Sequence, residues 1–358
     1  MSPRPPSLIV VVGSGGVGKT TLAAALGIAA ARGGDDTLVM TFDPSRRLKD
    51  ALGVGDEAAE REVEVPCGAP AALAAHLLDP RRTFDQLVTR YAPDAASRDR
   101  ILHNRFYDHL SGTLAGVLEY MAVERLFEVA RAGRHARVVL DTPPTRQALD
   151  FLEAPERLIG FLDSGALRVA LKPWFDERGR LRPTSHLGLL GRGVEALLDR
   201  VVGLDVLRDM AEFFQAFAPL YGGFRERARE VQALLRAPET LFLLVCRPDE
   251  EAIPDAMFFA RRLRDAGHRL GPLLVNRVHP RASARRAGTS AAPRVQEAGR
   301  LLAWLEERDR RGLASLRTLL ASDGELVEVP LLGAEPSDTA ALGELASILR
   351  GRLPADVL

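Results

Sequence analysis

Nine consecutive residues near the start of the chain have the types and spacing of a phosphate-binding loop. The stretch 13–21 reads GSGGVGKTT and contains the pattern G-x-x-x-x-G-K-T. Glycines let successive backbone N–H groups turn inward onto phosphate oxygens. Lys19 supplies a cation for the β- and γ-phosphates, and the Thr20 hydroxyl is a ligand for Mg²⁺. The residues expected to bind nucleotide are therefore Gly13, Ser14, Gly15, Gly16, Val17, Gly18, Lys19, Thr20 and Thr21.

The elements on either side of this loop are those that phosphate binding requires. An apolar, β-branched run, 8–12, precedes the loop, and an alanine-rich run from Thr20 to Arg32 follows it. A strand–loop–helix context separates a phosphate loop from a glycine-rich turn, which is the alternative interpretation. The helix directs its N-terminus at the same anion. Of 48 Lys and Arg residues only Lys19, Lys49 and Lys172 are lysine, so a lysine in the loop is unusual for this chain.

Two carboxylates follow predicted strands and are expected at the same edge of the sheet. Asp43 ends the strand 37–42, where it faces the γ-phosphate or its attacking water, and is a predicted catalytic residue together with Lys19. The alternative for Asp43 is a helix cap before the segment 48–52. Asp141 ends the strand 137–140 and precedes Thr-Pro-Pro, so it is predicted to hold Mg²⁺ directly or through water. The alternative for Asp141 is an ordinary turn residue.

The second half of the chain repeats the order strand, helix, strand. Strands are expected at 240–246, 273–278 and 325–329, with a helix at 252–266. Asn276 lies at the carboxyl end of the middle strand, where its amide can both donate to and accept from adenine. Repeated units of this kind predict an α/β fold of the P-loop NTPase type, with a mostly parallel sheet flanked by helices.

Between the two halves, helical patterns dominate. Helices are predicted at 70–78, 83–91 and 107–131, after an edge strand at 61–66. We expect one domain, 1–358, with a helical subdomain at 154–235 inserted after the strand that carries Asp141. Its apolar residues either form a core of their own, which we favour, or present a surface to an apolar client or membrane partner. For Glu119 and Glu124, in the helix before that strand, a solvated face or a buried salt bridge is favoured over a functional role.

Bulk composition excludes several classes of protein. The 48 basic and 48 acidic residues balance, so no net field favours nucleic acid or an anionic membrane. No apolar run has the length of a membrane span, and the first residues lack a signal-peptide core, so a cytoplasmic location is expected. Cys67 and Cys246 are isolated, which argues against disulfides or a cysteine-pair zinc site. The stretch 281–293 is expected to be a mobile loop and not a nucleic-acid site, because it has no aromatic residues.

Four segments, in order along the chain, resemble the ArsA family, which comprises ATPase subunits of arsenite pumps and related ATPases that target tail-anchored membrane proteins. They are GSGGVGKTT (13–21), TFDPSRRLKDALG (41–53), VVLDTPPTRQALDFLEAP (138–155) and LLVNRVHP (273–280). The chain is most similar to bacterial single-domain members that carry a DTPP switch. The resemblance implies ATP and Mg²⁺ as cofactors and a nucleotide sandwiched in a dimer. It also implies that Asp43 positions water in switch I, Asp141 lies near Mg²⁺ in switch II, and Asn276 contacts adenine.

The sequence departs from the family pattern at three places. The family loop reads G-K-G-G-x-G-K-[ST], and its first lysine reaches the nucleotide of the other subunit; Ser14 stands at that position here. The arsenite-site and zinc-bridging cysteines have no counterparts. The switch I pattern DPAH is replaced by residues 43–46, DPSR. Arsenite transport and zinc-stapled client targeting are therefore not expected.

Two functional hypotheses follow. The first is a Mg²⁺-dependent ATPase whose hydrolysis drives the rearrangement of a dimer, either a homodimer or a heterodimer. In a homodimer, Arg46 or Arg47 would have to replace the missing lysine. The second is a nucleotide-binding scaffold with little activity alone, which works as half of a heterodimer with a related subunit that keeps the lysine. A GTPase is disfavoured because the sequence has no N-K-x-D tetrad.

Overall fold

The computed structural model describes residues 6–41, 47–104, 107, 117–163, 209, 213, 216–280, 293–320 and 324–358. The chain divides into two compact units. The sheet unit is formed within 1–78, 129–148 and 234–358, and the helical unit within 79–128 and 149–233. The helical unit thus takes chain from before as well as after the strand that carries Asp141.

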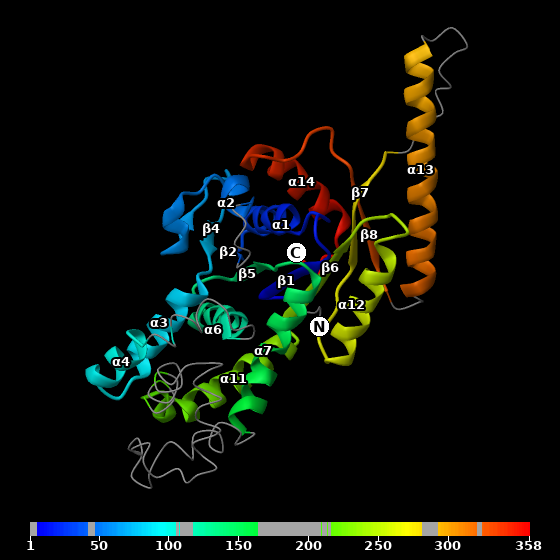
Figure 1. Ribbon diagram of the computed structural model, residues 1–358. Coiled ribbons are helices and arrows are strands. Elements are labelled where there is room, and N and C mark those ends of the chain that lie inside the picture. The colour runs from blue at the N-terminus through cyan, green and yellow to red at the C-terminus, as the bar shows by residue number, and fades with distance from the viewer. Residues whose placement is uncertain are drawn as a thin grey trace. The chain divides into compact units, whose positions relative to one another are not determined.

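The sheet unit is built on eight strands of the described chain (Figure 1). They are β1 (Leu8–Gly13), β2 (Thr37–Thr41), β3 (Val63–Glu64), β4 (Leu73–Leu77), β5 (Arg137–Asp141), β6 (Thr240–Cys246), β7 (Leu273–Val278) and β8 (Leu326–Pro330). Their order is β3-β4-β2-β5-β1-β6-β7-β8, and every pairing is parallel except that of β3 with β4. The expected mostly parallel α/β fold is confirmed, and β3 is the edge strand that the sequence predicts.

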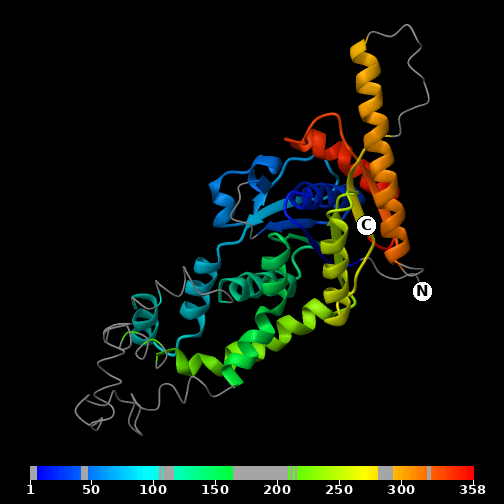
Figure 2. The same cartoon turned by 45° about the vertical axis from the view of Figure 1, so that its right-hand side comes forward.

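Helices cover both faces of this sheet. On one face α1 (Lys19–Gly33) packs beside α14 (Thr339–Arg352), and on the other lies α12 (Ile253–Asp265), as Figures 1 and 2 show. Residues 22–31 of α1 are all buried, and most of them are alanine. Small side chains allow the helix to approach the sheet closely, and the phosphate loop at its start is held against the strands as a result.

One predicted helix is wrong. The segment 70–78, expected to be helical, contains strand β4, which pairs with β2 on one side and β3 on the other. Its sequence, LAAHL, is rich in residues that favour helix and lacks β-branched residues. Pairing on both edges and burial of Leu73 and Ala75 override that local preference.

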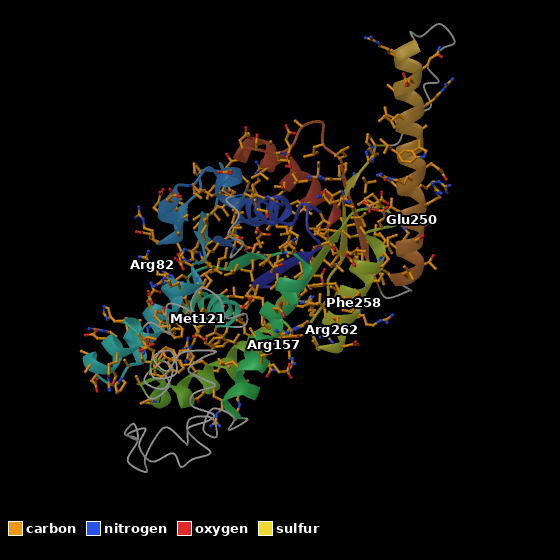
Figure 3. The ribbon with its side chains drawn as sticks, viewed as in Figure 1. Arg82, Met121, Arg157, Glu250, Phe258 and Arg262 are labelled. Atoms are coloured by element: carbon orange, nitrogen blue, oxygen red, sulfur yellow. The ribbon has the colours of Figure 1, made fainter. Side chains whose placement is uncertain are left out.

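Three helices of the described chain were not expected from the sequence. They are α4 (Ala95–Leu102), α13 (Pro293–Leu320) and α14. Helix α13 exposes large apolar side chains, including Leu301 and Trp304, each more than half exposed. Phe258 is a similar case on α12, one helical turn before Arg262 (Figure 3). None of the helices in the described ranges is both long enough and apolar enough to cross a membrane.

The helical unit has an aromatic core. It contains α3 (Pro80–Tyr91), α4, and the greater part of α6 (Val117–Ala132), α7 (Thr145–Asp163) and α11 (Tyr221–Arg236). Four rings stack in sequence, with centroids 5.0 Å apart for Phe84 and Tyr107, 5.8 Å for Phe84 and Phe217, and 5.6 Å for Phe213 and Phe217. Most of the helical segment predicted at 107–131 is seen as α6. Residues 108–116, 164–208 and 281–292 lie outside the described residues. Nearly all of the mobile loop predicted at 281–293 and most of the helical subdomain predicted at 154–235 fall there.

A charged group lies inside the helical unit. The carboxylate of Glu124 is fully buried, and it accepts hydrogen bonds from the Arg227 guanidinium and, at 2.9 Å, from the Tyr120 hydroxyl. Burial raises the pKa of Glu124, although the Arg227 charge opposes that rise. The arginine also stacks over Tyr91 and Phe127, with its guanidinium carbon 5.5 Å and 5.3 Å from the two ring centroids. Of the two structural alternatives left open for this carboxylate, a solvated helix face or a buried salt bridge, the structure shows the salt bridge.

Candidate nucleotide-binding site

The predicted phosphate loop connects β1 to α1 and has the backbone that its glycines permit. Gly13, Gly16 and Gly18 adopt positive φ angles of 152°, 74° and 96°. Space adds a second constraint, because a Cβ atom on Gly13 would lie 2.2 Å from the carbonyl oxygen of Val245. Only glycine satisfies both demands at this position.

The loop lysine is folded back across the loop. Lys19 is only 7% exposed, and its Nζ donates a hydrogen bond of 2.9 Å to the carbonyl oxygen of Ser14. This contact links the first residue of α1 to the second residue of the loop. It keeps the ammonium group beside the loop, where a cation can neutralise a bound anion.

Three oxygen-bearing side chains meet at the carboxyl edge of the sheet. Asp141 ends β5 and is fully buried, and its Oδ2 accepts hydrogen bonds from Thr20 Oγ1 at 2.8 Å and from Thr41 Oγ1 at 3.1 Å. The strand register produces this meeting, because Thr41 of β2 and Val11 of β1 both pair with Asp141. Hydroxyl and carboxylate oxygens are the donors that Mg²⁺ prefers, so these residues fit that ion.

Thr41 is a residue that the sequence reasoning missed. It is 1% exposed at the end of an apolar strand, and its hydroxyl helps to orient the carboxylate. The sequence signal for this role is a polar residue at the carboxyl end of a buried strand.

The segment after β5 is anchored to β1. The backbone N–H and hydroxyl of Thr142 both donate to the carbonyl oxygen of Val11, at 3.3 Å and 2.8 Å. Pro143 is buried and Pro144 is exposed. These contacts fix the direction in which the chain leaves the sheet, so the Asp141 carboxylate is held next to the phosphate loop.

The predicted base-contacting residue lies beside the loop. Asn276, at the end of β7, is 8% exposed, and its Nδ2 donates to the carbonyl oxygen of Val17 at 2.8 Å. A pocket of about 230 Å³ opens next to it. Its lining includes Gly18, Thr21, Asn276, Arg277, Pro330, Leu331, Leu332, Ala334, Glu335 and Pro336. The segment 330–336, which the sequence reasoning did not single out, therefore forms one wall.

Comparisons with known proteins agree with this geometry. A family model described as an anion-transporting ATPase, ArsA_ATPase, matches residues 7–178. An uncharacterized protein of Streptomyces coelicolor is 28% identical, over 92% of this chain and 76% of its own length. A putative arsenical pump-driving ATPase of Aquifex aeolicus is 23% identical, over 98% and 80%. ATPase ARSA1 of Chlamydomonas reinhardtii is 29% identical over 63% of this chain, which spans only 33% of that relative.

Residues 7–178, the part that the family model matches, belong to the ArsA family of ATPases. The predicted family resemblance and the prediction of an ATPase are thereby confirmed. The Ser14 difference and the individual site residues remain predictions.

Several side chains that the sequence predicts for the site take no part in the contacts described above. Asp43 and Arg46 fall outside the described residues, so the switch I predictions stay untested. Arg47 begins α2 (Arg47–Leu52) and is exposed. Ser14 is half-buried at the turn of the loop. The structure thus brings the phosphate loop, Asp141 and Asn276 together within the sheet unit.

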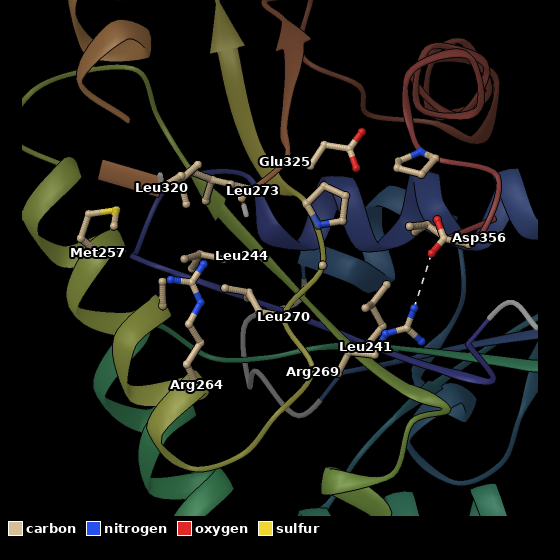
Figure 4. A pocket seen from close by; sticks show the side chains of 16 residues that line it. Leu241, Leu244, Met257, Arg264, Arg269, Leu270, Leu273, Leu320, Glu325 and Asp356 are labelled. Atoms are coloured by element: carbon tan, nitrogen blue, oxygen red, sulfur yellow. Dashed lines mark ion pairs between the residues drawn. The ribbon is translucent and has the colours of Figure 1, made fainter. Parts of the chain in front are cut away.

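A second pocket of the ArsA fold lies at the opposite edge of the sheet (Figure 4). It measures about 200 Å³ and is lined by residues at the amino ends of β6, β7 and β8, with Arg264 and Met257 from α12. At its rim Arg269 and Asp356 approach to 3.5 Å. No predicted site residue lines it, so we do not connect it with nucleotide.

The two cysteines do not form a metal site with other residues of the described chain. Cys67 is half-buried and Cys246 is buried, and no group of three or more His, Cys, Asp or Glu in the described part is arranged to hold a metal ion. Burial raises the pKa of the Cys246 thiol to about 12, which keeps it protonated at neutral pH.

Proposed function

We propose that this chain binds ATP at the loop 13–21 and hydrolyses it with Mg²⁺, and that the nucleotide state controls the conformation of a dimer. The observation that carries the proposal is the 2.8 Å hydrogen bond between Thr20 and Asp141. This bond joins the end of the phosphate loop to a buried carboxylate on β5, the strand that lies beside β1 in the sheet. Family membership supports nucleotide hydrolysis in general.

Each residue has a distinct task in this proposal. The loop N–H groups and Lys19 hold and neutralise the phosphates, and Thr20 and Asp141 would hold Mg²⁺. When bound, Mg²⁺ supplies positive charge to the phosphate oxygens. Asp43 orients the attacking water. The chemistry therefore depends on positioning and electrostatics more than on covalent catalysis.

The metal assignment is tested by removing one hydroxyl. Thr20→Val keeps the shape of the side chain and removes its oxygen, so Mg²⁺-dependent ATP turnover should fall by about 100-fold. The matched control is Thr37→Val. It removes a buried hydroxyl at the start of β2, away from the proposed metal site, and this hydroxyl donates to the Asp35 carbonyl oxygen at 2.7 Å. Equal turnover in Thr20→Val and wild type, measured over a Mg²⁺ titration, would remove Thr20 from the metal site.

The water-orienting assignment is tested by Asp43→Asn. A group that acts mainly in the transition state should affect kcat and leave ATP affinity nearly unchanged. Single-turnover kinetics and equilibrium binding measure the two quantities separately. A variant that turns over normally but needs more Mg²⁺ would show that Asp43 and Asp141 have the reverse roles.

A second function, a scaffold subunit with little activity alone, is favoured by Ser14. A serine hydroxyl is neutral and short, so it cannot carry charge to a nucleotide in another subunit as a lysine would. A charged group supplied in trans is worth about 10³–10⁵ in rate. If the scaffold proposal holds, Ser14→Lys should raise the turnover of the isolated protein. Robust wild-type turnover that is insensitive to Ser14→Lys, Arg46→Ala and Arg47→Ala would exclude it.

A further inference from the structure

We propose that Asn276 is a positioning residue for the phosphate loop, and that it shapes the loop for phosphate whether or not a base is present. The proposal rests on the proposed function, since it concerns the same nucleotide site. It goes beyond adenine recognition, because it makes phosphate affinity itself depend on an amide of strand β7.

The side chain of Asn276 is engaged at both of its ends by the protein. Nδ2 donates to the carbonyl oxygen of Val17 at 2.8 Å, and Oδ1 accepts from the backbone N–H of Arg277 at 2.9 Å. An asparagine amide has two N–H hydrogens and one acceptor oxygen. One hydrogen is thus committed to the loop, and the contact with Arg277 fixes the plane of the amide that delivers it.

The backbone around Asn276 is distorted in a way that aims this amide. The register between β7 and β8 shifts between Val275 and Val278. Within that irregularity Arg277 adopts a φ of 60°, and no other described residue except glycine has a positive φ. Bulges commonly re-aim a side chain, and a non-glycine residue in this region is held there by its surroundings. The distortion places the N–H of Arg277 where it holds Asn276.

The contact controls the direction of a peptide group in the loop. The peptide between Val17 and Gly18 is trans, so the N–H of Gly18 points opposite to the Val17 carbonyl and therefore away from Asn276. A Cβ atom on Gly18 would lie 2.3 Å from Asn276 Nδ2, so the amide occupies the space that a side chain would need. Asn276 and Gly18 form one fitted contact that sets the loop immediately before Lys19.

The two roles of Asn276 predict different ligand profiles. A residue that only reads adenine affects ATP and adenosine and leaves inorganic tripolyphosphate unchanged. A residue that positions the loop affects ATP and tripolyphosphate alike. Comparing the three ligands therefore separates the roles, and wild-type binding of tripolyphosphate tests the phosphate site independently.

The experiment is calorimetric titration of full-length Asn276→Ala with ATP, tripolyphosphate and adenosine in Mg²⁺. We expect ATP and tripolyphosphate to bind about 10-fold more weakly, because one hydrogen bond is lost and the Val17 carbonyl loses its partner. The matched control is Asn104→Ala, which removes a buried amide that donates to the Asp209 carbonyl oxygen at 2.9 Å in the helical unit. It should bind all three ligands as wild type does.

A second variant distinguishes loss of the hydrogen bond to Val17 from a general loss of folding. Asn276→Asp keeps the acceptor for the Arg277 N–H but cannot donate to Val17, so tripolyphosphate should again bind weakly while the thermal unfolding temperature stays near that of wild type. Loss confined to ATP and adenosine, or no loss in either variant, would overturn the proposal. A wild-type protein that binds neither ATP nor tripolyphosphate would instead refute the proposed function.

Discussion

The two units each bury a carboxylate completely, and they treat it differently. Asp141 in the sheet unit and Glu124 in the helical unit are both 0% exposed. Asp141 accepts hydrogen bonds from the hydroxyls of Thr20 and Thr41, whereas Glu124 accepts from the Arg227 guanidinium and the Tyr120 hydroxyl. The Asp141 cluster lies at the carboxyl ends of central strands of the sheet, and the Glu124 cluster lies between helices.

If Asp141 holds Mg²⁺ as proposed, the difference in partners separates a metal-binding carboxylate from a structural one. A threonine hydroxyl can turn its hydrogen aside and offer its oxygen to a cation, but a guanidinium has no acceptor. The threonine hydroxyls that donate to Asp141 can therefore give up those hydrogen bonds and coordinate a metal ion instead. The guanidinium that donates to Glu124 cannot do so, and this ion pair can only stabilise or specify the packing of the helices.

The largest expected effect concerns function in the sheet unit. Asp141→Asn should lower Mg²⁺-dependent ATP turnover by about 100–1000-fold, because the amide cannot replace the negative charge beside the metal. Stability should change little, since the two threonine hydroxyls can donate to an amide oxygen as well. Turnover and thermal unfolding are measured on one preparation. A variant that loses stability but not Mg²⁺ dependence would reverse the comparison.

The next effect concerns stability in the helical unit. Arg227→Met should lower the free energy of unfolding by about 3 kcal/mol, because it leaves the Glu124 carboxylate buried without its cation. Urea denaturation gives that value, and ATP turnover per folded molecule should match wild type. The double variant Glu124→Gln with Arg227→Met should recover part of the loss. Unchanged stability in the single variant would mean that the ion pair contributes nothing.

A third buried carboxylate sharpens the comparison, because it lies in the sheet unit and is held by a histidine and an arginine. Asp309 of α13 accepts from the backbone N–H of His279 at 2.8 Å and contacts its ring Nδ1 at 2.7 Å. Burial alone would raise the pKa of Asp309, but the bonds from His279 and Arg308 outweigh it and hold the pKa below its usual value.

The sign of the pH dependence follows from that lowered pKa. The ionised Asp309 carboxylate stabilises the folded state at pH values above its unfolded pKa of about 4. This stabilisation is lost as the pH falls through the lower pKa that Asp309 has in the folded protein. Asp309→Asn should therefore cost about 2 kcal/mol at pH 7 and almost nothing at pH 2. Denaturant unfolding at both pH values measures this. An equal cost at both would assign the effect to packing.

The smallest effect tests the strained residue beside Asn276. Arg277→Gly should raise stability by about 0.5–1 kcal/mol, because glycine adopts positive φ without steric cost. Its ion pair with Glu335 spans 3.5 Å at an exposed site and contributes little. Thermal unfolding, with Arg262→Gly on α12 as an exposed control, measures the change. Destabilisation by Arg277→Gly would show that the arginine side chain holds the bulge.

Apolar strands are predictable from the sequence because the pattern that marks them is local. β1, β5 and β7 are apolar runs that contain or end at a glycine, a carboxylate or an amide, and β6 is an apolar run after its first residue. β4 is not predictable in this way, because its strand character comes from pairing with β2 and β3, which local propensity does not record. The phosphate loop follows from its spacing and from the strand and helix on either side of it. The role of Thr41 does not, because it depends on the register that sets this residue beside Asp141.

The packing of α1 against α14 has a consequence for how the protein is made. Arg32, at the end of α1, donates at 2.6 Å to the carbonyl oxygen of Gly343, which lies 311 residues further along the chain. A ribosome that adds 5–20 residues per second needs roughly 15–60 s to cover that interval. During that time the face of α1 that packs against α14 lacks its partner, although earlier strands already cover the rest of the helix. That apolar face is therefore exposed until translation is nearly finished.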